Sequence, residues 1–372
     1  MINRADINPK MMHWARIRAG FNNGFENHLP SEIKTRYKKW ETGDVKPTWN
    51  QLRTVSKKYD LPTAFFFMES PPDFDEFPEL INYRKLDSNS PYIGNSPYLI
   101  KNIRECEIKR SIYIELLNEL NEKTIKFNTN NLTQNKKVFS RYIRDILGVS
   151  LDCQKSWVND PKHYSTLNKW KEIITSKLGI LIFESKNVNI SEMRGLCIFH
   201  EEVPIILLNG KDQPNGRIFT LFHELTHLIL GESAICGDDI DRDIEIFCNS
   251  VAGEFLVPED DLIKNFDNNL SDSKLKYLSN LYGVSEYVIL KRLLDTNKIN
   301  KSDYDLKTSN IYINNSNSSN KGNYYKNLIK YNGKPFYTVV LEAYDLGIIN
   351  SLEFSKFTNL SLKQIPKIQD LI

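Results

Sequence analysis

The sequence predicts an α+β fold that is mainly helical. Most of the 372 residues belong to segments whose apolar side chains recur at helical spacing, whereas residues 179–208 contain three short apolar runs of strand length. A proline-rich, acidic string at residues 70–78 predicts a linker between an N-terminal part and the rest. At roughly 100–200 residues per domain, this length allows two or three domains.

Composition and charge exclude several classes of protein. The 49 Lys and Arg residues nearly balance the 47 Asp and Glu residues, so the chain is not polybasic. Its 40% hydrophobic and 26% charged residues are typical of a soluble fold. No apolar run approaches the roughly 18 residues that span a bilayer, and the N-terminus lacks a signal-peptide core, so we expect a cytoplasmic protein without a membrane partner. The five cysteines contain no C-x-x-C pair and are expected to be reduced.

We expect four parts along the chain. Residues 1–70 form a compact all-α module, and residues 71–165 form a linker and a helical segment. Residues 166–305 contain the small sheet and the most informative motif, and residues 306–372 hold a flexible loop and C-terminal helices.

Short helices separated by turns are predicted for the N-terminal module. The expected spans are residues 9–20 with Met11, Trp14 and Ile17 inward, residues 30–40, residues 49–59 and residues 61–67. This module has 12 Lys and Arg residues against 7 Asp and Glu residues, a formal charge of +5. Its second helix carries the residues that we interpret as contacts with DNA phosphates, namely Lys34, Arg36, Lys38 and Lys39. Ser31, Glu32 and Thr35 are candidates for base contacts, and the alternative is a solvated cationic face.

The remaining elements follow from periodicity. Helices are expected at residues 98–122, 137–147, 164–177, 274–282, 285–294 and 338–346, with a loop at residues 310–323. Strands are expected at residues 179–183, 195–199 and 203–208, the last two joined by a tight turn at Glu201 and Glu202.

The motif that carries chemistry is His223-Glu224-Leu225-Thr226-His227, an H-E-x-x-H pattern inside an apolar helix that ends before Gly231. The i, i+4 spacing places both imidazoles on one helix face, as a tetrahedral Zn²⁺ requires of two nitrogen ligands. Glu224 lies between them as the expected general base. Zn²⁺ is therefore the predicted ion, with Mn²⁺ as the alternative.

A third ligand is sought on the next helix, residues 241–256. At about 100° per residue, Glu245 shares a face with Cys248 and Ala252, whereas Glu254 points the opposite way. Glu245 is thus the predicted ligand. Asp241 and the loop residues Asp238 and Asp239 are the alternative ligands. A favourable interaction with the dipole at the helix N-terminus explains these acids better.

These segments resemble the ImmA/IrrE family of metallo-endopeptidases, with its H-E-L-x-H and E-x-x-A-N-x-F-A-x-x-L-L-x-P patterns. The second pattern runs here from Glu245 to Pro258, with Cys248 and Val251 where Ala and Phe are commoner. Further likeness lies upstream, in Arg194-Gly195, in residues 204–209 and in residues 217–220. The N-terminal module is similar to Cro-like helix-turn-helix modules of the XRE type through Tyr37-x-x-Trp40-Glu41-x-Gly43, Lys46-Pro47-Thr48 and Gln51-Leu52.

The resemblance implies a helix-turn-helix module followed by a zincin-like, gluzincin-type metalloprotease domain. Such proteases are cytosolic and inactivate repressor-type regulators in phage, mobile-element or stress circuits, which makes a repressor-like protein the expected substrate. Arg194 and His200 are candidates for oxyanion or substrate contacts. The strand at residues 203–208 is a candidate edge strand to which an extended substrate adds.

Two other functions stay open at this point. The chain could be a DNA-binding transcriptional regulator whose metal domain senses a ligand or is catalytically silent. It could also be a toxin–antitoxin component of the same fold. The complete Glu224 chemistry favours the protease over both.

Overall fold

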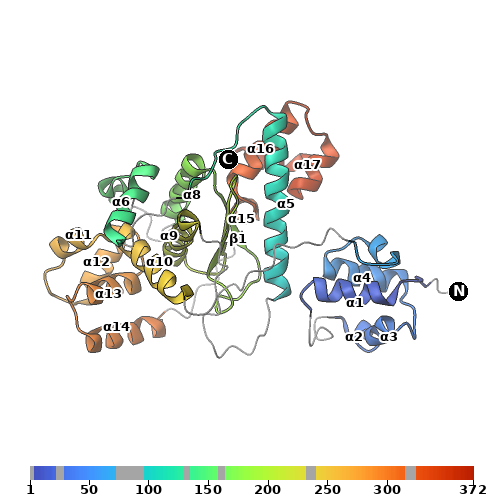
Figure 1. The fold of residues 1–372 in the computed structure, drawn as a ribbon, viewed down its shortest axis with the longest axis horizontal. Helices are drawn as coiled ribbons and strands as arrows, with labels where there is room; N and C mark the ends of the chain where they lie inside the picture. The colour runs from blue at the N-terminus through green and yellow to red at the C-terminus, as the bar shows by residue number, and fades with distance from the viewer. Residues whose placement is uncertain are drawn as a thin grey trace. The chain divides into compact units, whose positions relative to one another are not determined.

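The fold is seen in a computed structural model that describes residues 4–21, 29–72, 96–129, 135–157, 164–231, 240–314 and 324–372, without a few helix side chains such as that of Asp241. It is mainly helical with one small sheet, as the sequence predicts (Figure 1). Contacts divide the chain into two compact units, Met1–Glu105 and Cys106–Ile372. The finer division into four parts stays a prediction.

The N-terminal unit begins with short helices. These are α1 (Pro9–Arg18), α2 (Ser31–Lys34), α3 (Tyr37–Glu41), α4 (Trp49–Tyr59) and the 3-10 helix η2 (Thr63–Phe67). The α4 helix starts at a capping box in which Thr48 and Gln51 satisfy each other's backbone N–H groups. The predicted single helix at residues 30–40 is wrong, because a turn at residues 35–36 separates α2 from α3. Ile17 is also not inward, since 44% of its surface is exposed.

Buried aromatic residues hold this unit together. The Tyr37 and Tyr59 hydroxyls are hydrogen-bonded to each other, and the Tyr37 hydroxyl also donates to Glu41 Oε1 at 3.0 Å. Arg16 Nε lies 2.8 Å from the same Glu41 oxygen, so α1, α3 and α4 share one polar network. Burial raises the pKa of Tyr37 and of Tyr59 above the usual value, and both phenols therefore stay neutral hydrogen-bonding groups.

The sheet of the second unit has three strands, β1 (Leu181–Ser185), β2 (Gly195–Ile198) and β3 (Ile205–Asn209). Their order is β1-β3-β2, with β1 and β3 parallel and β2 and β3 antiparallel. The predicted antiparallel pairing of the last two strands is confirmed. The predicted tight turn at Glu201 and Glu202 is wrong, because residues 199–204 join the two strands. The predicted edge position of residues 203–208 is wrong, because β3 also pairs with β1 and is the central strand. The other strand of the hairpin, β2, lies at an edge of the sheet.

Helices cover both faces of this sheet (Figure 1). On one face lie α8 (Tyr164–Leu178) and α9 (Pro214–Leu230). These two helices share a hydrophobic core with Ile182 of β1 and Ile206 of β3. On the other face lies the second half of α5 (Pro97–Glu119), from which Lys109 Nζ approaches the Phe183 ring to 5.6 Å. Alternate residues of β1 thus meet different helices, as the period of a strand requires.

The remaining helices surround this centre. They are α6 (Lys136–Leu147), α7 (Leu151–Ser156), α10 (Ile240–Leu256), α11 (Glu259–Asn265), α12 (Asp272–Tyr282), α13 (Glu286–Asp295), α14 (Lys301–Asn314), α15 (Tyr324–Asn332), α16 (Lys334–Asp345), α17 (Ser351–Thr358), η3 (Leu362–Gln364) and α18 (Ile365–Gln369). The predicted loop at residues 310–323 is wrong for residues 310–314, which end α14, and residues 315–323 lie outside the described part.

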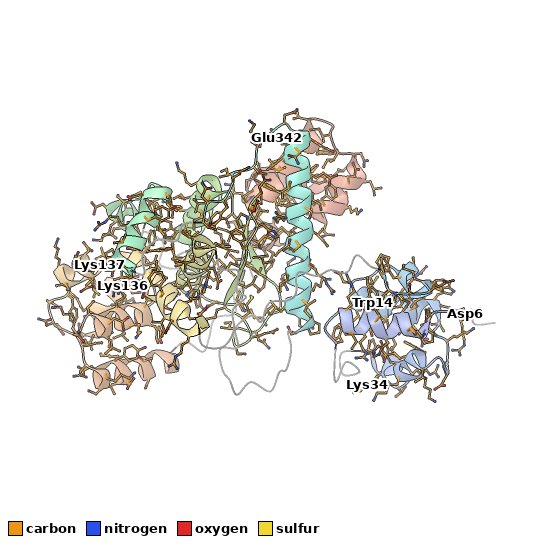
Figure 2. The ribbon with its side chains drawn as sticks, viewed as in Figure 1. Asp6, Trp14, Lys34, Lys136, Lys137 and Glu342 are labelled. Atoms are coloured by element: carbon orange, nitrogen blue, oxygen red, sulfur yellow. The ribbon has the colours of Figure 1, made fainter. Side chains whose placement is uncertain are left out.

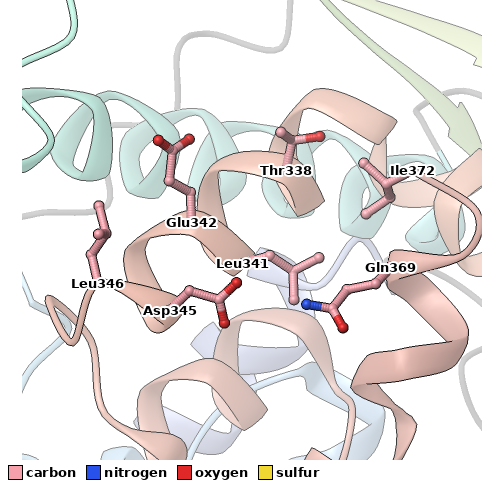
Figure 3. Close-up of a pocket in the computed structure, with 7 residues that line it drawn as sticks. All are labelled: Thr338, Leu341, Glu342, Asp345, Leu346, Gln369 and Ile372. Atoms are coloured by element: carbon pink, nitrogen blue, oxygen red, sulfur yellow. The ribbon is translucent and has the colours of Figure 1, made fainter.

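A separate core joins α5 to the C-terminal helices through residues such as Leu117, Tyr337 and Phe354. One open pocket of about 360 Å³ lies on this part of the chain. Figure 3 shows its lining, which comes from α16 and the end of the chain. It contains no residue of the H-E-x-x-H motif.

Close packing between β2 and α9 depends on the absence of a side chain at Gly195. A Cβ atom there would lie 2.3 Å from Thr220 Cγ2, far inside van der Waals contact. We therefore expect Gly195→Ala to lower the free energy of unfolding by about 1–3 kcal/mol, the usual cost of overpacking. Thr220→Ser removes that methyl group, so the double variant should recover a large part of the loss.

Thermal unfolding of the four proteins measures this coupling, with Thr220→Ser alone as the control. A Gly195→Ala variant as stable as the wild type would contradict the observed packing, as would a double variant no more stable than Gly195→Ala.

Candidate metal centre

The central helix of the site, α9, begins and ends where local chemistry favours it. Pro214 occupies its first turn, where no backbone N–H is needed, and Gly231 ends it with a φ of 73°. Nearly every residue of its second half is buried, including His223, Glu224 and His227. Buried polar side chains need hydrogen-bond or metal partners, so we expect specific neighbours to satisfy the polar atoms of these three residues.

The structure brings His223, His227 and Glu245 together. The two Nε2 atoms lie 3.1 Å apart, and Glu245 places Oε1 3.0 Å from His227 Nε2 and Oε2 3.6 Å from His223 Nε2. These are the only three His, Cys, Asp or Glu residues of the described chain that cluster closely enough to hold an ion.

The donor set fits a divalent ion. Bonds of about 2.0–2.1 Å in a tetrahedral zinc site separate neighbouring donor atoms by roughly 3.3 Å, and the three observed distances lie around that value. The two imidazole nitrogens face each other and the Glu245 carboxylate. A cation between these three donor atoms would attract the lone pairs of the nitrogens and the negative charge of the carboxylate. The residues present therefore suit the metal that the sequence predicts.

Aromatic packing fixes the position of α10 beside α9. The Phe222 and Phe255 rings stack with centroids 4.1 Å apart, and Trp170 of α8 meets Phe222 edge-on at 4.8 Å. The guanidinium of Arg144 lies 4.3 Å from the Phe255 ring centroid, and burial lowers the pKa of Arg144 to about 10. Phe222 directly precedes His223, so this packing also holds the α9 backbone at the first histidine.

The alternative acids are placed as follows. Glu254 is buried against Arg292 of α13, whose Nε also donates to Val257 O at 3.0 Å, so Glu254 serves a structural contact. Asp238 and Asp239 lie outside the described residues, and the side chain of Asp241 does too. Glu245 is the acid that the structure places beside both imidazoles.

Glu224 lies against the β2 strand. A Cβ atom on Gly195 would meet Glu224 Oε1 at 3.1 Å, so the first residue of β2 directly faces this carboxylate. The sequence offers no local signal for this contact, because the two residues belong to different elements. Because Gly195 has no side chain, the Glu224 carboxylate has room to lie against the β2 strand.

Arg194 and His200 lie at different places. Arg194 precedes Gly195, its side chain is half-exposed, and its Nη1 lies 3.3 Å from Asp212 Oδ2. His200 lies beyond the other end of β2, roughly 16 Å from Gly195 in extended chain, and its Nε2 is 3.1 Å from Glu107 Oε1 of α5. The structure thus places Arg194, and not His200, next to the strand residue that faces Glu224.

The four basic residues that the sequence analysis assigns to DNA phosphates lie on α2, on α3 and in the turn between them. Lys34, Arg36, Lys38 and Lys39 are all exposed, whereas the intervening Ile33, Tyr37 and Trp40 point into the core. Figure 2 labels Lys34 in this unit. Ser31 and Thr35 are also exposed, and the side chain of Glu32 is not among those that the structure describes.

Comparisons with known proteins bear on the metal centre. No helix of the described residues is long and apolar enough to cross a membrane. A search of curated proteins finds no relative of this chain. One family model matches residues 175–294, the IrrE N-terminal-like domain of the Peptidase_M78 family. The matched segment contains all three metal-binding candidates and Glu224, and it supports a metallopeptidase of the IrrE/ImmA type.

Proposed function

We propose that this chain is a cytosolic zinc-dependent endopeptidase that cleaves a repressor-type regulatory protein in a phage, mobile-element or stress-response circuit. The observation that carries the proposal is the convergence of His223, His227 and Glu245 next to a buried glutamate, within a segment that matches a metallopeptidase family. A His-His-Glu set leaves room for a water or substrate ligand, as in catalytic rather than structural zinc sites.

The roles of the residues follow from their chemistry. When bound, the ion supplies a Lewis acid that polarises the scissile carbonyl and lowers the pKa of the attacking water. Glu224 accepts the proton of that water and passes it to the leaving amine. Gly195, which faces the Glu224 carboxylate, keeps the base close to the strand where a substrate would bind.

The β2 strand is the proposed place for an extended substrate. Among the described strands it pairs with β3 alone, so its other edge can donate and accept main-chain hydrogen bonds. A peptide added there would pass Gly195 and hence Glu224. Arg194, half-exposed and directly before the first residue of this strand, is the proposed substrate contact.

Metal binding gives the first test. His227→Ala and Glu245→Ala should each remove a ligand and lower metal occupancy strongly, because three protein donors are needed to hold the ion. Asp243→Ala is the matched control, since Asp243 is an exposed acid on the same helix. Elemental analysis of the purified proteins measures occupancy and distinguishes Zn²⁺ from Mn²⁺. Full occupancy in Glu245→Ala would show that the ligand assignment is wrong.

Hydrolysis gives the second test. Incubation of the metal-loaded protein with repressor-like proteins encoded near its gene should yield one defined cleavage. Glu224→Gln should abolish that cleavage and keep the metal, because the amide retains the volume of the carboxylate and cannot accept a proton. Cleavage by Glu224→Gln at the wild-type rate would exclude Glu224 as the base, and metal loss in this variant would assign it to the ligand set.

Association with DNA is proposed for the N-terminal unit, and the exposure of its four basic residues supports it. If three to four phosphates are neutralised, log K should fall with log salt at a slope of roughly −3. Charge reversal at Lys38 and Lys39 should flatten the slope by about two units. Fluorescence anisotropy with a labelled duplex over a salt series measures both slopes. A binding constant that does not depend on salt would refute the DNA association.

A further inference from the structure

A second group of charged side chains lies on the α8 and α9 face of the sheet, centred on Glu184 of β1. Lys171 of α8 and Arg217 of α9 both form close ion pairs with its carboxylate. Lys330 of α15 completes the set, with Nζ 3.1 Å from Glu184 Oε2 and 2.9 Å from the Gly210 carbonyl oxygen. Four different elements, β1, α8, α9 and α15, thus supply one carboxylate and three cations. We call these four residues the Glu184 cluster.

The Glu184 cluster has more positive than negative charge. Its formal charge is +2, although the side chains of Glu184 and Arg217 are each only 1% exposed. Lys171 and Lys330 are 15% and 21% exposed. Burying cations without matching anions costs free energy, because the cations lose their hydration and low-polarity surroundings do not replace it.

The direction of the pKa shifts agrees with this imbalance. Burial lowers the pKa of Lys171 and of Lys330, and the neighbouring cations lower both further, while Glu184 opposes the shift. For Glu184 itself, burial would raise the pKa, but the three cations outweigh it and the pKa is lowered. The carboxylate is therefore fully ionised and still leaves positive potential in the cluster.

Arg217 also has an unused hydrogen-bond donor. Its Nη1 binds Glu184, but its buried Nε has no hydrogen-bond partner in the described part of the chain. Buried donors are nearly always satisfied, and an exception points to a water or ion that completes the site. A guanidinium offers donors in the planar fork that suits the oxygens of phosphate and carboxylate groups.

Two tyrosines flank the cations. The Tyr164 ring lies 5.7 Å from the Arg217 guanidinium carbon, and the Tyr331 ring lies 5.4 Å from Lys330 Nζ. About half of Tyr164 is exposed, and Lys330 is partly exposed, so the side of the Glu184 cluster that these two residues form reaches the protein surface. Both phenols can donate a further hydrogen bond to an anion.

We propose that the Glu184 cluster binds a tetrahedral oxyanion, either inorganic phosphate or the phosphoryl group of a small molecule. Such an anion carries a charge of about −1.5 to −2 near neutral pH, which matches the surplus of the cluster. Its oxygens would accept from the free Arg217 donor and from the two ammonium groups. Arg217 precedes His223 by six residues, roughly 9 Å along α9, so this site is separate from the metal centre.

Calorimetric titration of the full-length protein with inorganic phosphate, at constant ionic strength set by NaCl, tests the proposal. We expect one phosphate to bind at millimolar or lower concentration, with acetate binding about ten-fold or more weakly because it has one charge and two oxygens. Phosphoserine and a nucleoside monophosphate, titrated in the same way, distinguish a phosphoryl group on a small molecule from free phosphate. No phosphate binding up to about 20 mM, or equal binding of acetate, would overturn the proposal.

Variants localise the binding. Lys330→Gln should weaken phosphate binding about ten-fold or more, because it removes one of the three cations, and that cation is partly exposed. Lys334→Gln is the matched control, since Lys334 pairs instead with the exposed Glu172 at 3.0 Å. Lys330→Arg keeps the charge and should bind within a few-fold of the wild type. Equal weakening in Lys330→Gln and Lys334→Gln would place the anion elsewhere and refute the site.

Discussion

The packing of α10 against α9 is the constraint on which the site depends. The two histidines lie on one face of α9 because of their spacing, but a third donor has to come from another element. Stacking of Phe222 on Phe255, with Trp170 edge-on, fixes the crossing of the two helices one residue away from His223. That crossing brings the Glu245 carboxylate to 3.0 Å from His227 Nε2. A loss of this apolar contact would therefore act first on the metal-binding geometry.

The sheet supplies the second half of the site. Pairing of β3 with both neighbours leaves β2 at an edge, and Gly195 allows that edge to approach Glu224 directly. The proposed base and the proposed substrate strand are thus fixed by the same contact. The other outer strand, β1, contributes Glu184 to the Glu184 cluster, so the two outer strands of one small sheet lie beside different chemistry.

Much of the site could be predicted from sequence because its signals are local. The H-E-x-x-H spacing and the closing Gly231 define α9, and the angular position of Glu245 on the next helix separates it from Glu254 without coordinates. The α4 helix starts at a capping box and ends before Asp60, whose φ is 57°, and its bounds agree with the prediction to the residue. In each case the signal comes from residues that are separated along the chain by no more than a few helical turns.

Most of what the sequence did not reveal depends on contacts between distant segments. The central position of β3 depends on a parallel partner that precedes the hairpin, which alternation of side chains within the hairpin cannot reveal. His200 meets Glu107 on a helix far earlier in the chain, and Gly195 meets Glu224 across two elements. The break between α2 and α3 also escaped prediction, because the basic and apolar residues on both sides of Thr35 follow one helical pattern.

Anomalous X-ray diffraction from crystals of the purified protein tests the central claim most directly. The account predicts one strong peak at the zinc absorption edge, about 2.0–2.2 Å from the Nε2 atoms of His223 and His227 and from a Glu245 oxygen, with Glu224 beside it and not bound. A peak held by other residues, or crystals grown with added Zn²⁺ that show no peak between these three side chains, would contradict the account.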